Sequence, residues 1–184
     1  KNFGTIRGLR LLSPQVDVSS ATLKGVGAVC GYSGGSLEGD SVDGSDARVR
    51  AALTAADAEG IGGIAGYLAG SGQPTRQDLR DCTNEGLVLS SADADETSLA
   101  GRYIGGIVGY AYHASLGGCT SRAGRAADYE YTQADRSRLR GRYVGGIVGY
   151  SDGSVLYRCS TGVAAGYQAY IGGICGANEK NAAI

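Results

Sequence analysis

Ser33 and Ser151 each stand at the centre of a Gly-x-Ser-x-Gly motif, the residue pattern of a hydrolase nucleophile. In α/β-hydrolases this motif places the serine on a strand-to-helix turn, and the catalytic acid and histidine follow later in the chain. No histidine follows Ser151, and the related stretches carry Leu68 and Ala111 at this position, which have no hydroxyl group. The sequence therefore predicts that both serines are turn residues and not nucleophiles.

The other residues that could do acid–base or metal chemistry do not form a recognisable motif. His113 is the single histidine, and we expect it to be an exposed loop residue. The glycine-rich stretches lack the lysine of a phosphate loop, and neither a zinc nor a calcium motif is present. Some β-helical enzymes cleave polysaccharides with paired carboxylates, and the sequence leaves open which acids converge among Asp81, Glu85, Asp93, Asp95, Glu96 and Asp152. We accordingly predict no catalytic residue, no metal and no cofactor.

The five cysteines occupy two recurring positions of the sequence. Cys82, Cys119 and Cys159 end similar polar stretches, and Cys30 and Cys175 lie in similar apolar ones. Unpaired cysteine behaves as a small buried apolar residue. We predict that all five are free thiols in interior ladders, without a disulfide bond.

A charged and aromatic segment, Ala126–Arg142, is the candidate binding surface. Acidic residues alternate there with tyrosines, and arginines then follow at every second position, so that in a strand they share one face. The simpler interpretation is a hairpin that pairs an acidic strand with a basic one. The alternative is a docking face for an anionic group or a glycan, with tyrosines as platforms. Its residues would be Tyr129, Tyr131, Arg136, Arg138, Arg140 and Arg142.

These residues belong to a chain organised by internal repeats. The stretch Tyr-Val-Gly-Gly-Ile-Val-Gly-Tyr at 143–150 recurs closely at 103–110 and 61–67, and more weakly at 26–32 and 170–176. A recurring motif with variable spacing is typical of a repeat architecture with loop insertions. The shortest interval leaves too little chain for a βαβ unit, which takes about 30 residues or more. We therefore predict an all-β fold, a right-handed parallel β-helix of about five repeats, with three strand pieces per turn.

The repeat resembles the GLUG repeat of secreted and surface-anchored bacterial proteins, including IgA-protease-like proteins and adhesins. The resemblance rests on Val-Gly-Gly-Ile-Val-Gly-Tyr, the apolar-x-x-Cys stretch that follows it, and Ser-Thr-Gly-Val at 160–163. It covers roughly residues 24–177, with departures at Ala28 and Asp40, which holds the place of a cysteine. It implies a β-helical stalk or adhesive region of an exported protein and does not imply a neighbouring protease domain.

Composition narrows the class of protein further. The chain has 184 residues, 33 glycines without a collagen period, 42% hydrophobic residues and a net charge of −1. Such a charge gives no general attraction to nucleic acid or to an anionic membrane. No apolar run approaches the roughly 20 residues of a membrane span. We expect one domain over 1–184, with a partial turn at 1–23, repeats at 24–177 and the start of another turn at 178–184.

Local signals predict a few further details. Pro14 should lie at the end or the edge of any strand near it. The alanine-rich stretch Ser45–Ala58 could be a short helix or a strand, and the strand is favoured. One buried ladder is expected to contain Val29, Ile64, Ile107, Ile147 and Ile174.

The functional expectation is a non-catalytic structural or adhesive β-helical stalk at the cell surface or outside the cell. The alternatives are a carbohydrate-binding or polysaccharide-cleaving β-helix and a subunit of a head-to-tail filament. Its expected partners are adjacent turns of the parent protein or other copies end to end, and a glycan or host surface. Neither end of the chain offers a charged amphipathic helix as a cap, which is why end-to-end contacts are expected.

Overall fold

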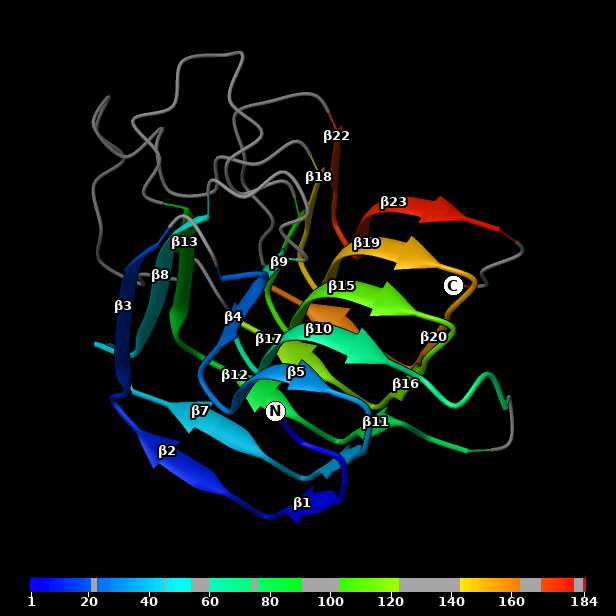
Figure 1. Ribbon diagram of the computed structural model, residues 1–184, viewed down its shortest axis with the longest axis horizontal. Coiled ribbons are helices and arrows are strands. Elements are labelled where there is room, and N and C mark those ends of the chain that lie inside the picture. Colours follow the sequence, from blue (N-terminus) through cyan, green and yellow to red (C-terminus); the bar gives the residue numbers. More distant parts are fainter. Residues whose placement is uncertain are drawn as a thin grey trace.

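The computed structural model is built from β-strands, and no helix occurs in the part of the chain that it describes. The described residues are 1–20, 23–44, 46–53, 60–73, 76–90, 103–122, 143–162, 170–180 and 184. Within them, the strands form five parallel sheets, here called sheets I to V, which stack short strands from successive repeats (Figure 1). The all-β prediction is confirmed.

The strands are grouped as follows. Sheet I contains β4 (Gly25–Gly27), β9 (Gly60–Gly62), β14 (Tyr103–Gly105), β18 (Tyr143–Gly145) and β22 (Tyr170–Gly172). Sheet II contains β5 (Cys30–Ser33), β10 (Ala65–Ala69), β15 (Val108–Tyr112), β19 (Val148–Asp152) and β23 (Cys175–Glu179). Sheet III contains β1 (Thr5–Arg7), β6 (Ser36–Glu38), β11 (Leu79–Arg80), β16 (Ser115–Gly117) and β20 (Val155–Tyr157). Sheet IV contains β2 (Arg10–Leu12), β7 (Ser41–Asp43), β12 (Thr83–Asn84), β17 (Thr120–Ser121) and β21 (Ser160–Thr161). Sheet V contains β3 (Gln15–Ser20), β8 (Arg48–Leu53) and β13 (Leu87–Ser90).

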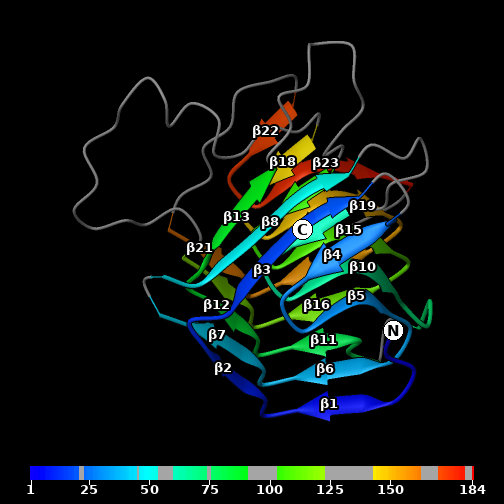
Figure 2. The same ribbon diagram turned by 60° about the vertical axis from the view of Figure 1, so that its left-hand side comes forward.

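From β4 to β13 the chain passes twice through sheets I to V in order, and β9 returns it to sheet I beside β4. Equivalent residues of successive repeats are therefore paired, as in the series Val26, Ile61, Ile104, Val144 and Ile171. Figure 2 shows β1, β6, β11 and β16 rising one above another, with β3, β8 and β13 side by side. This topology is compatible with a β-helix or another solenoid.

In the two turns described in all five sheets, β4 to β8 and β9 to β13, the expected three strand pieces per turn are corrected to five short strands. The first piece bends at its Gly-Gly pair, which separates sheet I from sheet II. The second piece bends between sheets III and IV, where one residue of each repeat adopts a positive φ angle. Gly39 and Gly118 suit that conformation, whereas Asp81 (53°) and Arg158 (51°) adopt it with a side chain.

Glycines of the recurring motif allow close packing. In the third repeat, a Cβ on Gly105 would collide with the carbonyl oxygen of Val108, and one on Gly106 with the Ser121 side chain. A Cβ on Gly109 would lie 2.5 Å from the backbone nitrogen of Ile61 in the previous repeat. The prediction that these glycines let strands bend and pack closely is confirmed.

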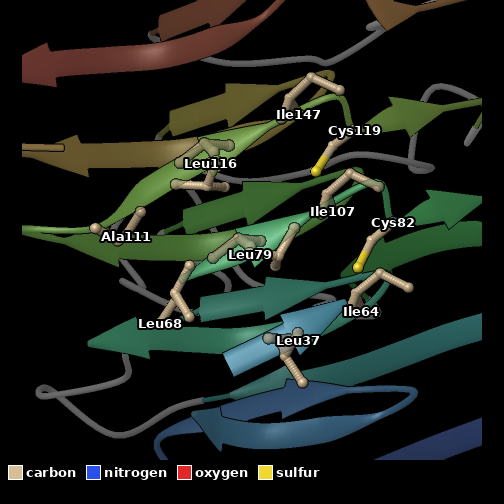
Figure 3. Packing of buried hydrophobic residues seen from close by; sticks show 14 of the residues in the cluster. Leu37, Ile64, Leu68, Leu79, Cys82, Ile107, Ala111, Leu116, Cys119 and Ile147 are labelled. Carbon is tan, nitrogen blue, oxygen red and sulfur yellow. The ribbon is translucent and has the colours of Figure 1, made fainter. Parts of the chain in front are cut away.

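Two buried clusters fill the space between the sheets. The larger one contains Leu37, Leu79 and Leu116 of sheet III, and Ile64, Ile107 and Ile147 from the bends between sheets I and II. Figure 3 shows these isoleucines one above another, with Cys82 and Cys119 beside them. Val29 and Ile174 are partly buried against the same cluster. The predicted isoleucine ladder is confirmed.

The smaller cluster lies between sheets I and V. Val26, Ile61, Ile104 and Val144 come from sheet I, and Val49, Ala51 and Val88 come from sheet V. The strand favoured for Ser45–Ala58 is confirmed over Arg48–Leu53 by β8, whose valine packs here. Pro14 lies between β2 and β3, each the first strand of its sheet, as predicted.

Candidate binding surface

The predicted patch of Tyr129, Tyr131, Arg136, Arg138, Arg140 and Arg142 lies outside the described residues. Asp93, Asp95 and Glu96 also lie outside them. The remaining candidate carboxylates belong to different sheets. Asp81 follows β11, Glu85 follows β12 and pairs with Arg122, and Asp152 ends β19. The described part of the chain contains no group of three His, Cys, Asp or Glu residues that could hold a metal ion.

Ser33 and Ser151 are strand residues of sheet II, not turn residues, and this prediction was wrong. Both are fully buried, and they share one ladder with Leu68 and Ala111. Two repeats place a serine at this interior position, where the others place Leu68 and Ala111. Burial inside a strand excludes the exposed elbow that a hydrolase nucleophile needs.

The aromatic feature that sequence reasoning missed is a stack of tyrosines on sheet II. The rings of Tyr32, Tyr67, Tyr110 and Tyr150 are stacked, with centroid distances of 5.3, 5.1 and 5.2 Å. Each tyrosine is half-buried. The recurring Gly-Tyr at the end of the motif is the sequence signal for this stack, because in-register repeats place equivalent residues about 4.8 Å apart.

A second tyrosine stack on sheet I lies against the first. Tyr103 stacks on Tyr143 at 5.5 Å, and Tyr143 stacks on Tyr170 at 5.0 Å. The two stacks meet where Tyr103 lies 4.8 Å from Tyr150 in a tilted arrangement. Within each stack, the rings of successive repeats therefore lie face to face.

Two hydroxyls of the sheet II stack donate to carboxylates of the next repeat. Tyr110 donates to Oδ2 of Asp152 at 3.2 Å, and Tyr150 donates to Oε2 of Glu179 at 2.6 Å. Burial, followed for Tyr110 by the charge of Asp152 and for Tyr150 by the hydrogen bond to Glu179, raises both phenol pKa values above their usual range. Both phenols therefore remain protonated donors over the physiological range.

Asp152 is the most buried acid on this face. Its side chain is 5% exposed, and its Oδ2 also accepts a 2.8 Å hydrogen bond from Lys180. The hydrogen bond to Asp152 and its charge raise the pKa of Lys180, so the lysine is a poor general base. His113 is exposed, as predicted, and its ring lies over Gly153 beside Tyr112.

The predicted cysteine ladder is present at the bends that precede β12, β17 and β21 of sheet IV. Cys82, Cys119 and Cys159 each donate a hydrogen bond through Sγ to the carbonyl oxygen two residues earlier, at 3.3, 3.4 and 3.5 Å. Asp40 occupies the equivalent position in the first repeat, where it is fully buried. All five cysteines are free thiols in the structure.

No helix in the described part of the chain is long and apolar enough to cross a membrane. The chain matches no protein-family model, no curated protein and no solved structure.

Proposed function

We propose that this chain is a right-handed parallel β-helix that serves as a structural and adhesive stalk, built from GLUG-like repeats. The observation that carries the proposal is the use of the recurring residues. The glycines permit close strand contacts, the isoleucines fill the interior, and the tyrosines of successive strands stack along their sheet. A repeat whose recurring residues are all used for packing is best suited to extending a rigid structure.

The right-handed coiling of the proposed β-helix follows from a general rule for crossover connections. Where a crossover joins two parallel strands of one sheet, the connection is right-handed in nearly all proteins. The reason is that a strand with the usual twist leads the chain back onto the sheet only in that direction. Each pair of successive strands in sheets I to V is joined by such a crossover.

Export to the cell surface is the setting that the GLUG-like repeat suggests. Exposed apolar side chains at both ends of the stack favour contact with further turns. Phe3 (72% exposed) and Leu12 (68%) lie on the first level, and Tyr170 (50%) and Ile171 (45%) lie on the last strand of sheet I. The partner turns would belong to the parent polypeptide or to a second copy, which would give a head-to-tail filament.

A comparison of binding with cleavage tests the non-catalytic part of the proposal. The purified chain is incubated with a panel of polysaccharides, and the release of new reducing or unsaturated ends is measured beside glycan-array binding. We expect no release, from the native chain or from Asp152→Asn. Release that Asp152→Asn abolishes would instead establish the polysaccharide-cleaving alternative.

Location and assembly are tested separately. Antibodies against the chain should label intact cells of the source organism without permeabilisation, and labelling only after permeabilisation would contradict surface display. Light scattering over a concentration series should show association of the isolated chain. A double Tyr170→Ser, Ile171→Ser variant should remain monomeric, whereas equal association would rule out contact through this end.

A further inference from the structure

Cys119 and Cys159 are held next to each other by the backbone pairing of sheet IV. The following residues, Thr120 and Ser160, are in register. The amide of Ser160 donates to the carbonyl of Cys119 at 2.8 Å. Adjacent strands lie about 4.8 Å apart, and a disulfide bond requires Cα atoms about 4.4–6.8 Å apart. The spacing of the two Cα atoms in adjacent strands therefore suits a disulfide bond.

The two thiols also influence each other's ionisation. The neighbouring Cys119 thiol, more than any other group, lowers the pKa of Cys159 to about 7, although burial opposes this shift. The Cys159 thiol and burial together raise the pKa of Cys119. Cys159 is thus the first of the two to become a thiolate, which is the nucleophilic form of cysteine.

The third cysteine of the ladder differs from this pair. Cys82 is fully buried, and burial raises its pKa to about 12. On its other side the ladder continues with the carboxyl group of Asp40, which opposes ionisation of the thiol. Cys159 is only half-buried, so a small reagent reaches it more easily than it reaches Cys82 or Cys119.

We propose that Cys119 and Cys159 form a dithiol site that small disulfides oxidise to a disulfide bond between successive repeats. The Cys159 thiolate attacks one sulfur of the small disulfide, which forms a mixed disulfide and releases one small thiolate. The Cys119 thiol then loses its proton and attacks the sulfur of Cys159, which releases the second small thiolate. Two protein thiols are oxidised, and one small disulfide is reduced to two small thiols.

Peptide mapping after exchange with oxidised glutathione tests the site. The reduced, folded chain carries Cys175→Ser, because Cys159 and Cys175 share the tryptic peptide 159–180. After incubation near pH 7.5, about the pH at which Cys159 is ionised, remaining thiols are alkylated and the chain is digested without reductant. We expect peptide 103–122, which contains Cys119, linked to peptide 159–180. A chain that retains unlinked peptides, or only a mixed disulfide on Cys159, would overturn the proposal.

Single cysteine-to-serine variants distinguish a disulfide bond of this pair from one that involves Cys82. Cys82→Ser keeps a hydroxyl that can donate to the same carbonyl and should leave the link unchanged. Cys119→Ser should accumulate the mixed glutathione disulfide on Cys159, since no second thiol can displace it. A link between Cys82 and Cys119 in the parent chain, which would join peptides 81–102 and 103–122, would refute the assignment. The mapping of the Cys175→Ser chain decides the proposal by itself.

Discussion

Gly109 of sheet II lies so close to Ile61 of sheet I that a Cβ on the glycine would be 2.5 Å from the isoleucine's backbone nitrogen. The same separation recurs one level up between Gly149 and Ile104, and again between Gly176 and Val144. Real Cβ atoms do not approach backbone this closely. The last glycine of the motif is therefore required by the spacing between two sheets, and the isoleucine and its neighbours can reach the interior only because of it.

Replacing this glycine by alanine should be strongly destabilising. Gly109→Ala must push backbone against backbone, and overpacking of this kind costs about 1–3 kcal/mol or more. Urea denaturation monitored by circular dichroism measures the loss. Gly162→Ala is the matched control, because a Cβ there would meet nothing within 4 Å. Equal stability of the two variants would contradict the close contact.

The isoleucine ladder predicts a cavity effect. Ile107 is fully buried between the equivalent residues of adjacent repeats. Ile107→Ala should lower the free energy of unfolding by about 2–5 kcal/mol. Leu12→Ala, at a side chain that is 68% exposed, should change it by less than about 0.5 kcal/mol. A loss below about 1 kcal/mol for Ile107→Ala would argue against an interior position.

Asn84 tests whether buried side-chain hydrogen bonds stabilise the interior. Its Nδ2 donates to the carbonyl of Gly106 at 2.7 Å and to that of Gly86 at 3.1 Å, and its Oδ1 accepts from the Gly86 amide. Asn84→Ala would leave these buried groups without partners, at a cost of about 1–3 kcal/mol. Thr83→Ala, at the neighbouring outward position, should cost less. Chemical denaturation of both variants compares the two positions, and the reverse order would exclude this role for Asn84.

Buried thiols should make the fold less stable at alkaline pH. Burial raises the pKa of Cys30 and Cys175 to about 11 and that of Cys82 to about 12, from 9.0. Above pH 9 the unfolded chain therefore loses thiol protons that the folded chain keeps, and the free energy of unfolding falls as pH rises. The raised phenol pKa values of Tyr110 and Tyr150 act in the same direction.

Thermal melting over a pH series checks this expectation. The melting temperature should fall between about pH 9 and 11, and the fall should be shallower in Cys82→Ser, which lacks one of the titrating thiols. A melting temperature that stays constant or rises over this interval would show that the thiols are accessible to solvent in the folded chain.

The sequence alone determined which residues recur. In a parallel stack, residues that recur at equivalent positions of successive repeats are in contact. The isoleucine ladder, the cysteine ladder with Asp40 in its first repeat, and the glycines at close contacts all follow from that rule. The reason is physical: in-register pairing brings equivalent residues to the same place on successive levels.

Only the tertiary structure decided how each repeat bends and what lies beside it. Asp81 and Arg158 adopt left-handed backbone at a corner where other repeats use glycine, and no residue type signals that in advance. Ser33 and Ser151 resembled turn residues locally, yet sheet II pairs them inside strands. The contact of Tyr103 with Tyr150 depends on the distance between two sheets, which is set by glycine packing between them. Sequence recurrence specifies contacts along the stack, whereas contacts across it depend on the path of the backbone.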